Sequence, residues 1–334
     1  MQSATEALVL PALRSRLQEI GLWSAVPAEI ASFLTAVEQL NLDRNQAILA
    51  ELISVARLLN DRGIDPVLLK GVAYLKTGVY TNPAERYLMD VDLLIPGPQL
   101  VVGVEALVKN GYEWDRNDRL GCFRHHHPPL RRTGSVCFEL HHSLGMGSCM
   151  SLLSASDVLE QSASYDLGGA RVRVPSPAHL TTHLLMHSQI QHSYHERIWP
   201  PLRAMYDLVR MRRRFDTELD WVAIDKSFHK AGKSAVLAMH LLQVQESLGI
   251  EPPFPIRLTS ATRLFWSRRK VLRTRPALRF LDPMYMYSTV LGRRLNLLHN
   301  ILKTPGGWRY LVRELIGTNF YKRLLRDVIE GRSR

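Results

Sequence analysis

Two aspartates separated by a single residue are the side chains whose types and spacing most clearly suggest chemistry. Asp90 and Asp92 alternate with apolar residues between Met89 and Leu93, and this alternation is typical of a β-strand with both carboxylates on one face. Carboxylates about 7 Å apart along a strand repel each other unless a cation lies between them. We interpret the pair as a Mg²⁺ site that leaves positions for water and phosphate oxygens, or else as two acids facing water at a sheet edge.

A strand, a glycine and a helix are predicted before the aspartates. The short apolar run from Pro66 to Lys70 ends in a charge, and Gly71 begins a helical pattern that continues to about Tyr80. Such an arrangement points backbone N–H groups beyond the end of the strand. A second strand is predicted for Tyr87–Ile95, which contains both aspartates.

Helices and antiparallel strands are predicted on either side of these segments. Residues 26–62 predict two helices, and Gly63 is placed to end the second. Leu100–Lys109 predicts another helix. Tyr112–His142 predicts antiparallel strands joined at the turn Arg132–Ser135.

The chain becomes mostly helical after a second hairpin signal at Asp166–Gly169. Ser176 is the predicted N-cap of the next helix, with Pro177 at its first position. The expected fold class is α+β, with a mixed sheet, flanking helices, an N-terminal helical segment and a C-terminal α-helical half. The predicted domains are an N-terminal helical segment (1–43), an α/β core (44–175), a helical domain that completes the cleft (176–255) and a basic helical C-terminal region (256–334).

Composition excludes several classes of protein. The chain has 334 residues, 46% hydrophobic and 22% charged, which excludes intrinsic disorder, collagen and a disulfide scaffold. No run of about 18 apolar residues occurs, so no transmembrane span is expected. The sparse cysteines lack Cys-x-x-Cys spacing and predict reduced thiols and a cytoplasmic location; they are Cys122, Cys137 and Cys149.

Positive charge is concentrated near the C-terminus. Residues 257–334 contain 18 Lys and Arg against 4 Asp and Glu, whereas the rest of the chain has a net charge of −2. Such a region faces nucleic acid, anionic lipid or an acidic partner, or is a solvated helical surface. We expect ordered helices with one basic surface for an anionic partner.

Four segments occur in a fixed order: Leu68–Gly71, Tyr80-x-x-Pro-x-x-Arg86, Asp90–Leu94 and Phe138–His141. In combination they resemble the uncharacterised bacterial nucleotidyltransferase family within the DNA polymerase β-like superfamily. That family has an apolar strand ending in Lys-Gly, a Tyr-x-x-Pro-x-x-Arg segment, Asp-(Ile/Val)-Asp-Leu-Leu and an acidic-Leu-His strand. The resemblance covers roughly residues 48–255 and implies a nucleotidyltransferase-like mixed sheet.

The resemblance implies a two-metal site. Asp90 and Asp92 are the implied paired ligands, and Glu139 is the implied third carboxylate. Glu139 would bind the metal that activates the attacking hydroxyl, or would accept its proton, while the other metal neutralises the leaving pyrophosphate. The implied cofactor is Mg²⁺, as two ions, with Mn²⁺ as the alternative.

Lys70 and Gly71 are implied to bind the nucleotide, because they stand where the superfamily has Gly followed by Ser or Gly. Two features depart from that pattern. Val72 lacks the phosphate-binding hydroxyl, and Gly71 lies 19 residues before Asp90, a longer spacing than the superfamily implies. Lys70 would substitute as a point charge on the triphosphate.

Arg86 and His141 complete the implied nucleotide site. The planar guanidinium of Arg86 would hold phosphate bidentately from the loop before the metal strand. For both Lys70 and Arg86, the alternative is a salt bridge to Glu85 or Asp90. His141 shares a predicted strand face with Glu139. It would orient a phosphate or a metal-bound water, or pack beside the acid.

The remaining histidines give weaker signals. His179, His183 and His187 are spaced i, i+4 and i+8, but His-Glu-x-x-His is absent, so a polar stripe lining the cleft without a metal is favoured. His125–His127 are consecutive, and strand alternation would direct His126 away from the other two. Three adjacent histidines do not make a zinc site by themselves.

These features favour an enzyme: Mg²⁺-dependent transfer of a nucleoside monophosphate from an NTP to a hydroxyl or phosphate acceptor, with release of pyrophosphate. The acceptor is left open between a small molecule, a protein side chain and an RNA end. The alternative is a non-catalytic protein that retains the fold and binds nucleotide or RNA, which Val72 and the basic C-terminal region support. A metal-dependent phosphoesterase would explain the acids and histidines but not Lys70, Gly71 or Arg86.

Overall fold

The computed structural model of the protein describes residues 8–115, 125–145, 149–192, 194, 199–275 and 278. The chain divides into two compact units, Met1–Thr262 and Arg263–Arg334. The helices of the first unit, including short 3₁₀ and π segments (η), are α2 (Leu10–Glu19), η1 (Trp23–Ala25), α3 (Ala28–Asn60), α4 (Lys70–Lys76), η2 (Pro83–Glu85), η3 (Gly97–Gln99), α5 (Leu100–Lys109), α6 (Ala155–Gln161), α7 (Pro177–Leu185), η6 (Met186–Gln191), α8 (Leu202–Phe215), η7 (Asp216–Glu218), α9 (Trp221–Lys230) and α10 (Ser234–Leu248).

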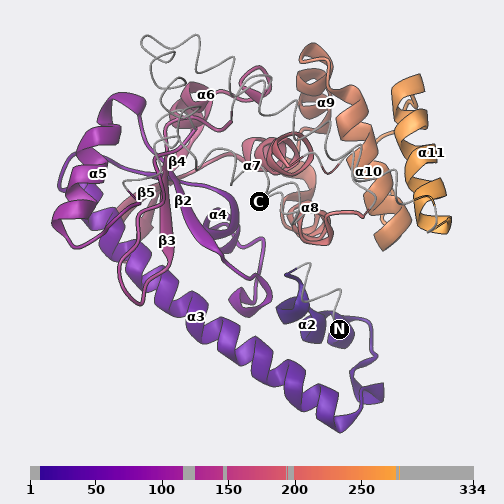
Figure 1. The fold of residues 1–334 in the computed structure, drawn as a ribbon, viewed down its shortest axis with the longest axis horizontal. Helices are drawn as coiled ribbons and strands as arrows, with labels where there is room; N and C mark the ends of the chain where they lie inside the picture. The colour runs from indigo at the N-terminus through magenta and orange to yellow at the C-terminus, as the bar shows by residue number, and fades with distance from the viewer. Residues whose placement is uncertain are drawn as a thin grey trace, which may run out of the picture. The chain divides into compact units, whose positions relative to one another are not determined.

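A five-stranded mixed sheet forms the centre of the first unit (Figure 1), with the strand order β3-β2-β1-β5-β4. The strands are β1 (Val67–Leu68), β2 (Asp90–Leu94), β3 (Cys137–His141), β4 (Ala163–Leu167) and β5 (Ala170–Val174). The β2–β3 and β1–β5 pairs are parallel, whereas the β1–β2 and β4–β5 pairs are antiparallel. A mixed sheet with flanking helices confirms the α+β class.

The helix before the sheet is one element, so the expectation of two helices within residues 26–62 is wrong. Helix α3 runs unbroken for 33 residues from Ala28 to Asn60, because the sequence between these residues contains neither Gly nor Pro to interrupt it. The predicted domain boundary between residues 43 and 44 therefore falls inside α3. The helix ends as expected before Gly63, which has a φ of 71°.

Helices α3 and α5 pack together against the apolar side of the central strands. The approach is close at Gly103 of α5, where an added Cβ would lie 3.0 Å from Ile95, 3.3 Å from Leu59 and 3.6 Å from Leu140. Leu59, Ile95 and Leu140 are fully buried. Because successive strand residues point to opposite faces, burying Leu93 and Leu140 on this side directs Asp92, Glu139 and His141 to the other.

Antiparallel pairing flanks β3, as predicted for Tyr112–His142. Isolated bridges join Glu113 to Arg131 and Leu130 to Phe138, and the turn between them contains Gly134 with a φ of 77°. The predicted second hairpin is also present, with β4 and β5 joined at Gly168 and Gly169.

The helical half begins at the predicted residue. Ser176 is the N-cap of α7, its Oγ accepts a hydrogen bond from the backbone N–H of His179, and Pro177 is the first helical residue. Helix α7 continues into the π-helical segment η6. Helix α10 ends at Gly249, which is in the left-handed conformation.

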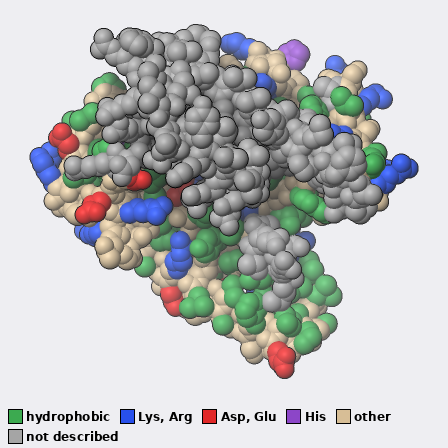
Figure 2. Space-filling model, viewed as in Figure 1, with side chains coloured by type: hydrophobic (Ala, Val, Ile, Leu, Met, Phe, Trp, Pro, Cys, Tyr) green, Lys and Arg blue, Asp and Glu red, His purple; other side chains and the backbone are tan. Residues whose placement is uncertain are grey.

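Exposed apolar side chains gather where α2 is followed by the first half of α3. Ile20, Leu22, Phe33 and Leu40 are 45–69% exposed, and Figure 2 shows hydrophobic side chains concentrated at the lower end of the molecule in that view. Within the described residues, no helix is long and apolar enough to cross a membrane.

The second unit contributes helix α11 (Ser260–Thr274), which begins just before the division between the units. Most of the predicted basic region, residues 256–334, lies outside the described residues, as does Cys122. Cys137 and Cys149 form no disulfide within the described part of the chain.

Candidate active site

The parallel pairing of β2 and β3 brings acidic residues from two distant segments together. Asp92 lies directly beside Glu139, and Asp90 lies beside Cys137. One oxygen of Asp92, one oxygen of Glu139 and one ring nitrogen of His141 all lie within 4.8 Å of one another. We refer to Asp90, Asp92, Glu139 and His141 as the acidic cluster.

Asp92 is the buried centre of the acidic cluster. Its side chain is 2% exposed, and Oδ1 accepts hydrogen bonds from Lys70 Nζ at 2.6 Å and from His141 Nε2 at 2.7 Å. Burial alone would raise the pKa of this carboxyl, but Lys70 and His141 hold it well below its usual range. Asp92 is therefore ionised at neutral pH.

Lys70 reaches Asp92 from an uncommon backbone conformation. It is the first residue of α4 and has a φ of 48°, a region that residues other than glycine rarely adopt and that costs on the order of 1–3 kcal/mol. Burial opposes the charge of its ammonium, yet Asp92, Glu139 and Asp90 raise its pKa overall. The structure thus places a lysine charge directly on the acidic cluster.

Packing explains why residue 71 is glycine and residue 72 is valine. A Cβ on Gly71 would lie 2.5 Å from Leu88 Cδ2, so only glycine fits without displacing that buried side chain. Val72 is 1% exposed and belongs to the hydrophobic core, which accounts for the missing hydroxyl. The role of Gly71 in binding nucleotide stays a prediction.

Asp90 is the carboxyl of the acidic cluster whose pKa is raised. Burial raises its pKa to about 6, and repulsion from Asp92 and Glu139 adds to the effect, while Lys70 opposes it. A divalent cation between the carboxylates would relieve this repulsion. Asp92, Glu139 and His141 offer two carboxylates and one imidazole nitrogen within 4.8 Å of one another, a donor set that Mg²⁺ or Mn²⁺ can use. Asp90 shares their side of the sheet but is not part of that close group, so the fit to the implied metal rests on the other three.

Glu139 and His141 are linked through a shared contact. His141 Nε2 lies 3.5 Å from Glu139 Oε2. Burial lowers the pKa of His141, but its hydrogen bonds to Asp92 and Glu139 raise it above the ordinary value. Burial raises the pKa of Glu139, whereas the His141 contact and the nearby His126, 3.9 Å away, lower it overall. Glu139 is therefore ionised at neutral pH and can hold a cation or accept a proton.

Arg86 makes a buried ion pair with a residue that was not expected from the sequence. Its Nε lies 2.8 Å and its second guanidinium nitrogen 3.1 Å from the two carboxylate oxygens of Asp207 on α8. The hydroxyl of Tyr80 donates to the same carboxylate at 2.5 Å. The partner is thus Asp207 rather than Glu85 or Asp90, and the Tyr-x-x-Pro-x-x-Arg segment is attached to α8 through it.

Arg203 is a cation near the acidic cluster that sequence reasoning missed. It lies one helical turn before Asp207 on α8, and among the described residues it makes no hydrogen bond or ion pair. Burial and the neighbouring Arg86 lower its pKa, and Asp90 is one of its electrostatic neighbours. Its spacing of four residues from Asp207 places both side chains on one face of α8.

The consecutive histidines do not alternate as expected. The rings of His125 and His126 both lie near His141, with centroid distances of 5.2 and 5.0 Å, whereas His127 packs edge-on against Trp114. The prediction that His126 points away from the other two is wrong, because this segment forms an isolated bridge rather than a regular strand.

Two of the three helical histidines contribute to the surroundings of the acidic cluster. Burial lowers the pKa of His183 to about 3 and that of His187 well below its usual range, and in both cases the Lys70 ammonium adds to the effect. Both rings are therefore neutral. His179 instead has Asp157 as its electrostatic neighbour.

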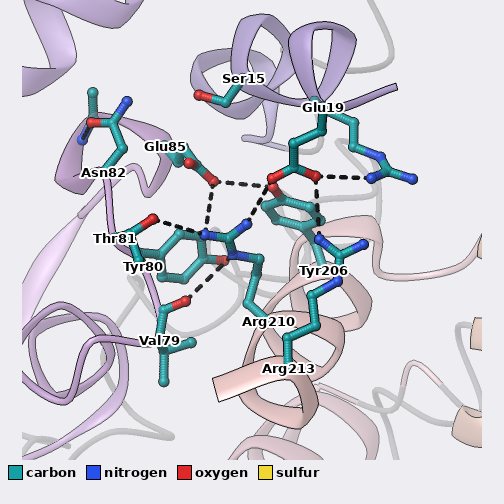
Figure 3. Close-up of polar contacts among 12 residues, drawn as sticks. Ser15, Glu19, Val79, Tyr80, Thr81, Asn82, Glu85, Tyr206, Arg210 and Arg213 are labelled. Atoms are coloured by element: carbon teal, nitrogen blue, oxygen red, sulfur yellow. Dashed lines mark hydrogen bonds and ion pairs between the residues drawn. The ribbon is translucent and has the colours of Figure 1, made fainter. Parts of the chain in front are cut away.

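A second polar network positions the loop that leads into β2 (Figure 3). Arg210 of α8 reaches Glu19 of α2 at 3.1 Å and Glu85 of η2 at 3.7 Å. Tyr206 donates to Glu85 at 3.1 Å, and Arg213 pairs with Glu19 at 3.2 Å. The network thus links the N-terminal helix and α8 to the loop that precedes β2.

Comparison with known proteins gives a family. Residues 1–249 match the model of a protein family described as an uncharacterised nucleotidyltransferase. Among solved structures, the chain is similar to an antigenic nucleotidyltransferase-like protein from Paracoccidioides brasiliensis, with a TM-score of 0.36 and 15% identity, over 62% of this chain and 94% of that chain. None of the curated proteins matches the sequence.

Proposed function

Because the chain belongs to the family of uncharacterised nucleotidyltransferases, we propose that it transfers a nucleoside monophosphate from an NTP to a hydroxyl or phosphate group. In this reaction an acceptor oxygen bonds to the α-phosphorus, the bond from that phosphorus to the bridging oxygen breaks, and pyrophosphate leaves. The proposal includes membership of the DNA polymerase β-like superfamily, although Val72 and the spacing between Gly71 and Asp90 depart from that superfamily's pattern.

The parallel register of β2 and β3 is the observation that carries this proposal. It sets Asp92 beside Glu139, with Asp90 two residues earlier on the same face. These carboxylates come from segments that are 47 residues apart. Acids that are buried together without such a use would cost stability, because each raises the free energy of ionising the others.

We propose that Asp90, Asp92 and Glu139 hold two Mg²⁺ ions, or Mn²⁺. Bound there, the metal would supply Lewis-acid activation of the attacking oxygen and neutralisation of the pyrophosphate. The raised pKa of Asp90 supports this assignment, since burial and the neighbouring carboxylates outweigh the positive charges of Lys70 and Arg203.

The protein's own residues supply proton transfer, orientation of the carboxylates and positive charge for the triphosphate. Glu139 is ionised and accepts the proton of the acceptor hydroxyl, while His141 fixes the orientation of the Asp92 carboxylate through its 2.7 Å contact. Lys70 and Arg203 supply positive charge for the triphosphate. Arg86 acts less directly, because its guanidinium is committed to Asp207.

A non-catalytic protein that binds nucleotide or RNA is the second candidate. The specific observation in its favour is the Lys70–Asp92 pair, in which the ammonium lies 2.6 Å from the carboxylate and neutralises a metal ligand. In that case the acidic cluster would be a structural ion-pair centre, and nucleotide would bind without turnover.

The proposal is tested by pyrophosphate release from each of the four NTPs labelled at the α-phosphorus, with Mg²⁺ or Mn²⁺. Wild-type protein is compared with Asp92→Asn and with the control Asp43→Asn, which changes an exposed carboxylate on α3. Label is followed on the protein itself, on RNA ends and on a pool of small-molecule alcohols and phosphates.

The proposed function predicts metal-dependent release in wild type and in Asp43→Asn, with a loss of at least 100-fold in Asp92→Asn. Nucleotide binding of equal affinity in all three proteins, with no release of pyrophosphate in any of them, would instead establish the non-catalytic candidate.

A further inference from the structure

The segment η6 that follows α7 brings two histidines face to face. Its π-helical hydrogen bond runs from the backbone N–H of His192 to the carbonyl of His187, at 3.1 Å, so residues five apart are aligned on one side of the helix. The Nε2 atoms of His187 and His192 are 3.3 Å apart, and their ring centroids are 4.5 Å apart. In an ordinary α-helix, residues five apart do not face each other.

The separation of these nitrogens matches a shared metal ion. Zinc binds imidazole nitrogen at about 2.0–2.1 Å with tetrahedral angles, which puts two ligating nitrogens about 3.3–3.4 Å apart. The two nitrogens also lie within the distance of a direct hydrogen bond, so the same arrangement serves an N–H···N bond in the metal-free protein and a shared ion in the metal-bound protein.

A third imidazole nitrogen lies next to this pair. His183 is one helical turn before His187, and their ring centroids are 6.2 Å apart. The His183 side chain is 3% exposed, and its Nε2 has no hydrogen-bond partner among the described residues. A buried nitrogen without a partner costs about 1–3 kcal/mol. The ligand atoms of His183, His187 and His192 do not all lie within 4.8 Å of one another, so the His183 ring must turn toward the pair to complete a site.

We propose that His183, His187 and His192 form a second metal site, separate from the acidic cluster, that takes a nitrogen-preferring ion of the Zn²⁺ class. An all-imidazole donor set favours Zn²⁺ over Mg²⁺, which prefers oxygen. Three protein ligands leave a fourth position for water. Occupation of the site ties α7 to the end of η6 and places a fixed cation on the helical side of the acidic cluster. The inference does not depend on the proposed function.

The test is metal binding by the full-length, EDTA-treated protein, titrated with Zn²⁺ by calorimetry and with Co²⁺ by visible absorption, which is intense for tetrahedral sites. Four variants are compared with wild type. Two are double variants, His187→Gln with His192→Gln and Asp92→Asn with Glu139→Gln. The other two are the single variant His192→Gln and the control His229→Gln on α9, an exposed histidine outside the site. Circular dichroism of the metal-free proteins establishes folding, and excess Mg²⁺ in wild type serves as a second way to occupy the acidic cluster.

The inference predicts one tetrahedral Co²⁺ per chain in wild type, in His229→Gln, in the Asp92/Glu139 variant and in wild type with excess Mg²⁺. The His187/His192 variant should bind Zn²⁺ at least 100-fold more weakly, and the single variant His192→Gln, at the half-buried end of the segment, should bind it at least tenfold more weakly. Unchanged affinity in both histidine variants would overturn the inference. Loss of the Co²⁺ spectrum in the Asp92/Glu139 variant and with excess Mg²⁺ would also overturn it, because the ion would then belong to the acidic cluster.

Discussion

Arg86→Met is expected to destabilise the protein strongly, because it leaves Asp207 as a buried and unpaired carboxylate. Arg86 is 8% exposed and Asp207 is 2% exposed, and two hydrogen bonds of 2.8 and 3.1 Å join them. Removing one member of such a buried pair costs about 3–5 kcal/mol. The expected decrease in melting temperature is on the order of 10 °C, at about 2–4 °C per kcal/mol for a unit of this size.

A double-mutant cycle measured by urea unfolding separates the ion pair from simple loss of volume. Combining Arg86→Met with Asp207→Leu removes both charges, so the double variant should be more stable than the sum of the two single effects predicts, by about 2 kcal/mol. Arg171→Met is the matched control. Its partner Asp65 and Arg171 itself are 40% and 66% exposed, so its loss should cost less than about 1 kcal/mol.

The outcome that would refute this reasoning is an Arg86→Met protein of wild-type stability that no longer binds NTP. That result would mean that the guanidinium serves phosphate rather than Asp207, as the sequence motif first suggested.

Three further predictions concern the surroundings of the acidic cluster. Arg203→Gln should weaken NTP binding about tenfold, since hydrogen bonds between charged groups contribute about 1.5–3 kcal/mol. The melting temperature should stay unchanged. If Arg203→Gln bound NTP as tightly as the control Arg62→Gln, which changes an exposed arginine, the role given to Arg203 would be contradicted. Gly71→Ala should cost about 1–3 kcal/mol in urea unfolding through overpacking against Leu88, and a stable Gly71→Ala protein would show that Leu88 can move aside. Burial raises the pKa of Glu85 above its ordinary 4.5, so between these two pKa values the folded state binds more protons than the unfolded state. The free energy of unfolding should therefore fall as pH rises through the folded pKa of Glu85. Glu85→Gln should remove this part of the pH dependence, and an unchanged slope of unfolding free energy against pH in that variant would contradict the argument.

Local sequence pattern predicted the strand that carries Asp90 and Asp92, and the strand face shared by Glu139 and His141. It could also place the N-cap at Ser176, because capping depends on neighbouring residues alone. The interruption predicted within residues 26–62 was wrong, because neither Gly nor Pro occurs between Ala28 and Asn60 and α3 continues through this segment.

The contacts that make the site depend on residues far apart in the chain. No local pattern indicates that Arg86 will pair with Asp207, 121 residues later, or that Lys70 will reach Asp92 through a positive φ. The sequence also did not predict the π-helical turn that aligns His187 with His192, since α-helical spacing pairs residues three or four apart. Tertiary packing decides these contacts, so the sequence indicated the acids, Lys70 and His141 but not which of these side chains would pair.

Binding of Mn²⁺ in the presence of a non-hydrolysable NTP analogue, followed by electron paramagnetic resonance, tests most directly whether the acidic cluster is a metal site. The account predicts two Mn²⁺ ions per wild-type chain with mutual magnetic coupling, because paired catalytic metals lie about 3.5–4 Å apart. It predicts the loss of the coupled pair in Asp92→Asn and its retention in Asp43→Asn. Equal Mn²⁺ binding by wild type and Asp92→Asn would contradict the account.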